Sequence, residues 1–423
     1  MREMKDSGIS WVGEIPTNWT IGRIGGLYSL RNQKVSDKDY EPLSVTMKGV
    51  LPQLETAAKT NDGDNRKLVR KGDFAINSRS DRRGSCGIAD RDGSVSLINT
   101  ILKPRNQMNA RYYNWLFHTS MFADEFYKWG HGIVDDLWST NWEEMKKIQI
   151  PVPSCAEQQR IAEFLDRECG KIDGLEADIQ AQIDTLEQYK RSVITEAVTH
   201  GLNPSAPMKD SGIPWVDEVP QNWGIRRVKY IATCLKKGNG ITKEDIVEDG
   251  DTLCIRYGEV YTKYNLSFFE CTTRTNKERI SSKQYFTQGD ILFACTGELI
   301  EEIGKNIVYL GTGDCLAGGD IIILKHKQNA RYLNYALNSE CVQAQKSCNK
   351  AKLKVVHISA FEIGNIKIAL PPLDEQQEIA DYLDNKCAEI EQIIADKKSQ
   401  IETLDNYKKS LIFEYVTGKK EVV

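Results

Sequence analysis

The chain carries the same opening block twice. MKDSGISWVGEIPTNW begins at Met4 and MKDSGIPWVDEVPQNW begins at Met208, and twelve of the sixteen positions are identical. Three further blocks recur in the same order: NARY at 109–112 and 329–332, a proline-led block with Glu-Gln-Gln at 148–169 and 366–387, and a tyrosine-containing block at 183–199 and 401–417. A chain of 423 residues has room for two or three folding units. The sequence therefore predicts one structural plan built twice.

A long helix is expected at the end of each copy. Apolar residues there fall seven apart, which is typical of a coiled-coil seam. In the first copy they are Leu165, Ile172, Ile179, Leu186 and Val193, and in the second copy Leu383, Ile390, Leu404 and Leu411. Lys397 interrupts the second series, and we assign Leu175, Tyr189, Ile393 and Tyr407 to the alternate row of the seam.

The ends of both helices are marked in the sequence. Ser154 with Glu157, and Asp374 with Gln377, have the spacing of a capping box, while Gly201 and Gly418 are typical helix terminators. Because the intervening residues return the chain to begin the second helix, we expect the two helices to pack antiparallel. Gln182 and Gln400 occupy matched positions, either inside the seam or partly exposed.

The middle of each copy differs from the other in sequence. Both middles alternate short apolar runs with helical patterns, which indicates an α/β or α+β domain. The predicted fold class is α+β, with two tandem domains separated by a pair of long antiparallel coiled-coil helices and a pseudo-two-fold internal repeat. The expected boundaries are 1–153 for the first domain, 154–200 for its helix, 201–371 for the second domain and 372–423 for its helix.

Composition limits the remaining possibilities. No uninterrupted apolar stretch is long enough to span a membrane, so we expect a cytoplasmic protein. The eleven cysteines include no Cys-x-x-Cys pair, so free thiols are expected and a metal site is not. The net charge of −4 conceals two acidic helical stretches and a mildly basic remainder.

The sequence gives no support for catalysis. Glycine-rich segments between 297 and 319 miss the spacing of phosphate-binding and dinucleotide-binding loops, and Pro371-Pro372 is not set in an amino-methylation motif. No nucleophile elbow or zinc-protease helix is present either. We predict no catalytic residue and no cofactor for this chain.

Both variable middles contain basic clusters among Ser, Thr, Asn and Gln. The first has Arg66-Lys67 and the segment 78–85, and the second has Arg226-Arg227, Lys236-Lys237 and Arg256-Tyr257. Such side chains neutralise phosphates and read base edges, although a single cluster is equally well explained as a solvated face. The recurrence of clusters in both middles favours nucleic-acid binding.

Together, the paired blocks Trp11–Trp19 and Trp215–Trp223 and the two Glu-Gln-Gln helix starts resemble the specificity subunit of type I restriction-modification systems. The resemblance covers the whole chain. It implies two target recognition domains that read the halves of an asymmetric, split double-stranded DNA sequence. It also implies two modification subunits that methylate adenine with S-adenosylmethionine, and ATP-driven restriction subunits, as partners of a non-catalytic reader.

The resemblance transfers no base-contacting residue, because the reading surfaces are the variable part of that family. From the basic and polar residues after the Gly-Asp strands, the candidate DNA contacts are Ser78, Arg79, Arg82, Arg83, Thr296, Lys305 and Asn306. From the repeated blocks, the candidate partner-binding residues are Trp11, Trp19, Trp215 and Trp223, which are alternatively plain core residues. Two other functions remain open: a coiled-coil scaffold that binds no DNA, and the recognition part of a fused restriction-methylation enzyme.

Overall fold

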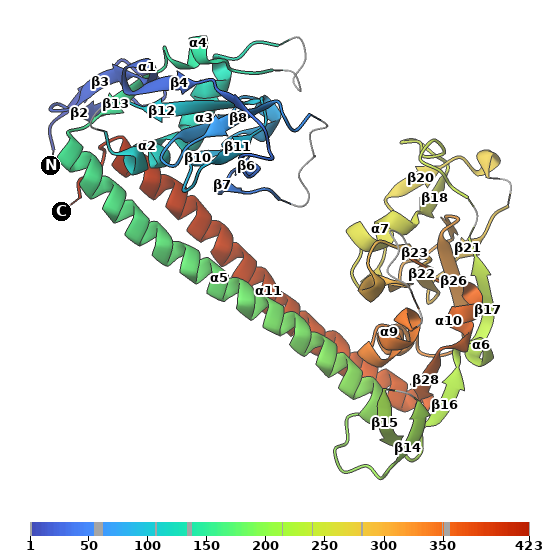
Figure 1. Ribbon diagram of the computed structural model, residues 1–423. Coiled ribbons are helices and arrows are strands. Elements are labelled where there is room, and N and C mark those ends of the chain that lie inside the picture. Colours follow the sequence, from blue (N-terminus) through green and yellow to red (C-terminus); the bar gives the residue numbers. More distant parts are fainter. Residues whose placement is uncertain are drawn as a thin grey trace. The chain divides into compact units, whose positions relative to one another are not determined.

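The computed structural model describes residues 2–54, 62–105, 108–132, 138–213, 215–238, 240–280, 282–348, 350 and 356–422. The chain divides into two compact units. Unit 1 is Met1–Gln180 with Lys398–Val423, and unit 2 is Ala181–Lys397. Each unit contains one variable middle together with parts of both long helices, α5 (Cys155–His200) and α11 (Leu373–Val416) (Figure 1).

Unit 1 is built around a four-stranded antiparallel sheet. Its order is β10 (Cys86–Ile88), β9 (Phe74–Asn77), β12 (Asn99–Pro104) and β4 (Tyr28–Arg31). A three-stranded sheet has the order β11 (Gly93–Val95), β8 (Arg66–Val69) and β5 (Lys34–Val35). The paired strands are β1 (Met4–Asp6) with β2 (Glu14–Pro16), β3 (Thr20–Arg23) with β13 (Gln149–Val152), and β6 (Leu43–Thr46) with β7 (Gly49–Pro52).

Two helices supply most of the aromatic core of unit 1. Asn109 caps α2 (Ala110–Phe117) and Thr119 caps α3 (Ser120–Lys128), each by accepting hydrogen bonds from backbone N–H groups of the first turn. Phe117 of α2 lies 4.9 Å from Phe74 of β9 and 4.5 Å from Phe122 of α3, measured between ring centroids. The short helices are α1 (Ile24–Leu27), α4 (Trp142–Met145) and the 3-10 turn η1 (Ser80–Arg82).

Unit 2 has a larger five-stranded sheet. Its order is β17 (Ala232–Lys237), β26 (Ile321–His326), β22 (Ile291–Ala294), β24 (Asn306–Tyr309) and β19 (Ser267–Phe268). A second sheet has the order β20 (Thr273–Thr275), β18 (Thr252–Ile255), β25 (Cys315–Ala317) and β21 (Tyr285–Phe286). The paired strands are β14 (Met208–Ile213) with β15 (Val216–Pro220), β16 (Gly224–Arg227) with β28 (Lys367–Leu370), and β23 (Thr296–Gly297) with β27 (Val356–His357).

The helices of unit 2 repeat the plan of unit 1. Asn329 caps α8 (Ala330–Leu337) as Asn109 caps α2, and Ser359 caps α10 (Ala360–Asn365). The others are α6 (Val228–Ile231), α7 (Tyr257–Thr262), α9 (Glu340–Ser347) and the 3-10 turns η3 (Lys277–Arg279) and η4 (Ile300–Glu302). Strands of both units pair mostly antiparallel while helices follow them in sequence, so the predicted α+β class is confirmed.

The predicted helix ends are confirmed with one exception. Ser154 accepts a hydrogen bond from the Glu157 N–H at 3.3 Å, and Gly201 and Gly418 adopt the positive φ typical of a helix C-terminus. The second helix begins at Leu373, so Asp374 lies inside the first turn instead of capping it. Its carboxylate still stands where the positive end of the helix dipole favours a negative charge.

The long helices pair antiparallel within each unit. In unit 1 the ring centroids of Phe164 and Tyr415 lie 4.3 Å apart, and Asp173 forms an ion pair with Lys408. Residues later in α5 thus contact residues earlier in α11, so the two helices run in opposite directions. In unit 2 Gln182 accepts a hydrogen bond from Lys397, and Lys190 forms an ion pair with Glu391. Gln182 and Gln400 are both exposed, so neither is inside the seam.

The residues of the predicted main row of the seam are buried or half-buried, whereas those of the predicted alternate row are exposed. Leu165, Ile172, Val193, Leu383, Ile390 and Leu411 are buried, whereas Ile179, Leu186 and Leu404 are half-buried. Leu175, Tyr189, Ile393 and Tyr407 are each more than two-fifths exposed. The packed alternate row stands one residue further on, at Cys169, Ile183 and Ala197 in α5 and at Cys387 and Ile394 in α11.

None of the eleven cysteines is in a disulfide in the structure, and eight of them are buried. Within the described ranges, no three His, Cys, Asp or Glu side chains cluster closely enough to hold a metal ion. None of the described helices combines the length and the apolar character that crossing a membrane requires.

Candidate nucleic-acid interface

The repeated NARY and Glu-Gln-Gln motifs bind each other. In unit 1 the Asn109 backbone N–H donates to Gln158 Oε1 at 2.9 Å, and the Asn109 side-chain amide donates to Gln159 Oε1. Gln158 is 2% exposed and also donates to the Pro153 carbonyl at 2.8 Å. This contact, named here the Asn–Gln clamp, fastens α2 to the start of α5.

Unit 2 repeats the Asn–Gln clamp with its own residues. The Asn329 N–H donates to Gln376 Oε1 at 3.0 Å, its side-chain amide donates to Gln377 Oε1 at 2.7 Å, and Gln376 donates to the Pro371 carbonyl at 2.8 Å. Each clamp is flanked by an ion pair, Arg111 with Asp166 and Arg331 with Asp384. The recurrence of these two motifs is therefore explained by contacts inside each unit.

Trp19 and Trp223 are core residues and are not exposed for a partner. Each is 1% exposed, and each donates its indole N–H at 2.9 Å to a glutamate of the following long helix, Glu157 or Glu375. A Cβ at Gly418 would lie 2.9 Å from the Trp19 ring. The prediction that these two tryptophans contact partner subunits is therefore wrong, because the opening block needs them to bind its own helices.

Trp11 and Trp215 differ from those two and from each other. Trp11 is half-buried against Phe122, with ring centroids 5.9 Å apart. Trp215 is 54% exposed and has φ of 73°, a left-handed conformation that costs a bulky residue about 1–3 kcal/mol. Trp215 is thus the predicted partner-binding residue that the fold leaves free and holds in a strained form.

The candidate reading group of unit 1 lies on the surface. Arg79, Arg82 and Arg83 are exposed at η1, directly after β9, and Ser78 is half-buried beside them. The Arg83 guanidinium pairs with Asp124 at 2.8 Å and lies 5.3 Å from the Tyr127 ring centroid. The structure thus brings the four predicted residues together, with Arg83 partly engaged.

The candidate group of unit 2 is different. Asn306 is fully buried, and its amide donates to the Asn334 side-chain oxygen at 2.8 Å, so the prediction that it contacts DNA is wrong. Lys305 is half-buried and donates to the Tyr264 carbonyl at 3.0 Å. Thr296 is half-buried and bonded to His357 Nδ1 at 3.1 Å. This segment serves mainly to build the domain.

A buried lysine organises the same region. Lys346 is 2% exposed, and its ammonium donates at 2.8 Å to Asn306 Oδ1 and to the carbonyls of Gly304 and Leu337. Burial lowers the Lys346 pKa from its ordinary value to about 7. No motif identifies this lysine, because only the folded chain surrounds it with acceptors.

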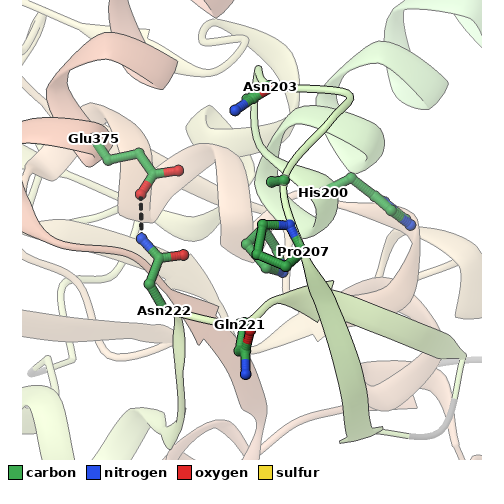
Figure 2. Close-up of a pocket in the computed structure, with 8 residues that line it drawn as sticks. His200, Asn203, Pro207, Gln221, Asn222 and Glu375 are labelled. Atoms are coloured by element: carbon green, nitrogen blue, oxygen red, sulfur yellow. Dashed lines mark hydrogen bonds between the residues drawn. The ribbon is translucent and has the colours of Figure 1, made fainter.

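A hollow of about 460 Å³ lies where the end of α5 meets the second opening block (Figure 2). Glu375 closes one side, where its carboxylate accepts from Asn222 at 3.3 Å and from the Trp223 indole at 2.9 Å. The His200 ring is bonded to the Thr199 hydroxyl at 2.8 Å. These groups are engaged in holding the junction and do not form an acid–base pair.

A second hollow, of about 910 Å³, lies at the end of β17 in unit 2. Its lining includes Lys237, Lys243, Arg256, Tyr257 and Lys263. The sequence marks Arg256-Tyr257 as one basic cluster among several, but sequence spacing does not bring Lys243 and Lys263 beside it.

Comparison with known proteins decides the family. Residues 16–185 and 220–403 match the family model of the Type I restriction modification DNA specificity domain. The chain belongs to this family. It is a specificity subunit of type I restriction-modification systems with two DNA specificity domains, one in each unit.

Individual relatives agree with this assignment. The type I restriction enzyme MjaVIII specificity subunit of Methanocaldococcus jannaschii is 23% identical over 96% of this chain and 94% of its own length. The putative type I restriction enzyme MjaX specificity subunit of the same organism is 25% identical over 67% of this chain and 62% of its own length. The MjaVIII relative is thus similar to both units of this chain.

A solved structure agrees with the fold. It is described as "Structural basis underlying complex assembly and conformational transition of the type I R-M system". The match covers 96% of this chain and 99% of the solved chain, with a TM-score of 0.70 and 15% sequence identity. At this identity the likeness concerns the fold alone.

Proposed function

We propose that this specificity subunit reads an asymmetric, bipartite double-stranded DNA sequence, one half with each unit. The observation that carries the proposal is the contrast between matched edges and unmatched middles. The Asn–Gln clamps and buried tryptophans recur in both units, whereas the surfaces beyond them differ in sequence and in sheet order. Two different reading surfaces predict two different half-sites.

The subunit itself carries no chemistry in this proposal. Adenine methylation is supplied by two modification subunits, and cleavage by ATP-driven restriction subunits. This division is supported by the name specificity subunit that the relatives carry and by glutamates and histidines that are engaged in structural contacts. The protein acts on chromosomal DNA, so we place it in the cytoplasm.

In unit 1 the DNA contacts are Arg79 and Arg82, with Ser78 and Arg83 beside them. Their support is exposure on one turn after β9, where guanidinium groups can reach phosphates or guanine edges, and Arg82 pairs with the neighbouring, exposed Asp81 at 3.5 Å. In unit 2 Thr296 and Lys305, which follow the matching Gly-Asp strand β22, are half-buried. They are weaker candidates for DNA contact, since both side chains are already hydrogen-bonded within the unit.

Trp215 is the proposed contact for a modification subunit. An exposed aromatic held in a strained backbone is typical of a residue retained for binding. Trp215→Gly removes the ring and relieves the strain, so this variant is expected to fold at least as well while losing affinity for the modification subunit. Trp11→Gly, at the matched half-buried position, is the comparison variant, expected to lose stability. Unchanged assembly of Trp215→Gly would refute the contact.

The function is tested by co-expressing the chain with its modification subunit and mapping N6-methyladenine across the host genome. The expected result is one split motif, methylated on both strands, with two different halves. Arg79→Ala with Arg82→Ala is expected to abolish or relax the half read by unit 1. Absence of any motif with an active modification subunit would refute the proposed function.

A further inference from the structure

The hollow at the end of β17 is formed where backbones approach closely. Gly238 follows β17 and donates its N–H to the Ile321 carbonyl at 2.7 Å, while Gly318 donates to the Ile255 carbonyl at 2.9 Å. A Cβ at Gly238 would come within 2.2 Å of the Gly318 carbonyl oxygen, so a side chain is excluded there. The result is a cavity of about 910 Å³ with charged side chains around it.

Two of its four cations are already neutralised. Lys237 pairs with Asp320 at 3.2 Å, and Lys263 pairs with Glu259 at 2.6 Å. Lys243 and Arg256 form neither a salt bridge nor a side-chain hydrogen bond in the described part of the chain. The hollow therefore has two uncompensated positive charges, which select an anionic ligand.

Arg256 gives the second indication. Its Nε is buried and has no hydrogen-bond partner within the described residues. A buried donor without a partner costs about 1–3 kcal/mol, so an acceptor that this side chain reaches by a small movement into the hollow would stabilise it. Tyr257, 41% exposed on the same turn, adds a hydroxyl and an aromatic face beside the guanidinium.

The hollow is separate from the proposed partner contact. Within unit 2, β17 ends at Lys237, which lines the hollow together with residues of α7 and of the turn before β26. Neither the residues of the Asn–Gln clamp nor Trp215 is part of this lining. A modification subunit bound at Trp215 therefore does not use the residues of the hollow.

We infer that the second recognition domain contacts duplex DNA through this hollow, with Arg256 and Lys243 donating to the acceptor atoms of a phosphate or a guanine edge. The inference rests on the proposed function and replaces Thr296, Lys305 and Asn306 as the principal contacts of unit 2. Both phosphate oxygens and guanine O6 and N7 accept from a guanidinium, and the experiment separates them.

The test uses the full chain assembled with its modification subunit and a duplex carrying the mapped motif. Arg256→Gln and Lys243→Gln are compared with Lys327→Gln, an exposed residue that follows β26 in the same unit. We expect Arg256→Gln to weaken binding at least about tenfold and Lys327→Gln to leave it unchanged. Lys243→Gln is expected to lower the slope of log affinity against log salt by about one. Lys243 is exposed, so its removal does not endanger folding.

The outcomes are separable. If Arg256 contacts a base, Arg256→Gln relaxes one position in one half of the methylated motif. If it contacts a phosphate, all sequences weaken equally and the salt slope falls. The inference is overturned if both variants bind like Lys327→Gln while the wild type methylates a split motif. Absence of a motif for the wild type would instead overturn the proposed function.

Discussion

At the scale of single residues, the molecule depends on polar side chains that are buried and fully bonded. Lys346 is the clearest example, because three acceptor oxygens surround an ammonium that burial disfavours. Its pKa of about 7 in the fold is below the ordinary 10.5, so between these values the unfolded chain binds more protons than the folded one.

Stability of unit 2 is therefore expected to rise with pH between about 7 and 10.5, by up to about 1.4 kcal/mol per pH unit from this lysine. Lys346→Met removes the contribution. The free energy of unfolding of both proteins, measured by urea titration at pH 7, 8 and 9, should show a difference that grows with pH. A difference independent of pH would contradict the lowered pKa.

The Asn–Gln clamp gives a second residue-scale prediction. Gln158→Ala leaves the Asn109 N–H and the Pro153 carbonyl without their partner, so it should destabilise unit 1 by about 2 kcal/mol or more. Gln159→Ala, next in sequence and less buried, is expected to cost less than about 1 kcal/mol. Equal losses, measured by thermal unfolding, would mean that the clamp is not a buried bond network.

At the scale of elements, the two long helices share one register. Lys190 and Lys408 occupy matched positions in the alternate row, and their partners Glu391 and Asp173 are matched as well. A charged pair at a seam position favours one register over its neighbours, because a slip would leave the lysine unpaired.

The ion pair is expected to stabilise the helix pair modestly. A double-mutant cycle of Lys408→Ala and Asp173→Ala should give a coupling of about 0.5–1 kcal/mol that falls at high salt, because the aspartate is exposed. The matched cycle at Lys190 and Glu391 provides the comparison. Zero coupling in both cycles at low salt would show that other contacts fix the register.

These elements also show how far sequence reasoning reaches. Seven-residue spacing is a local property, so it predicts two helices and the row through Leu165 and Leu383. The spacing does not show whether the second packed row lies three or four residues after each residue of this first row. Leu175 is apolar and yet exposed, while Cys169 is packed, because the facing helix decides which side of the row is covered.

The same limit applies to the reading surfaces. The surface position of Arg79 and Arg82 could be predicted, since a charged turn after a buried strand lies outside the core. The burial of Asn306 could not, because it depends on Asn334 and Lys346, which are remote in sequence. The Arg256 hollow likewise requires three segments that are remote in sequence to meet, one of them α7.

At the scale of the whole molecule, the repeated edges predict that the middles are interchangeable. Trp19 comes directly before the first middle and Trp223 directly before the second. Each middle ends in a strand, β13 or β28, that leads into the matched start of α5 or α11. We consider a chimera in which a second copy of residues 224–371 replaces residues 20–153. It keeps the hydrogen bond from Trp19 to Glu157, and the copied Asn329 takes the place of Asn109 in the Asn–Gln clamp. It should fold and assemble with the modification subunit.

The most direct test is the methylation motif of this chimera, read by mapping N6-methyladenine in cells that also express the modification subunit. If each unit reads one half of the target, the motif changes from two different halves to two copies of the half read by unit 2. If the original half of unit 1 persists in the motif although its middle is gone, independent reading by the two variable middles is contradicted.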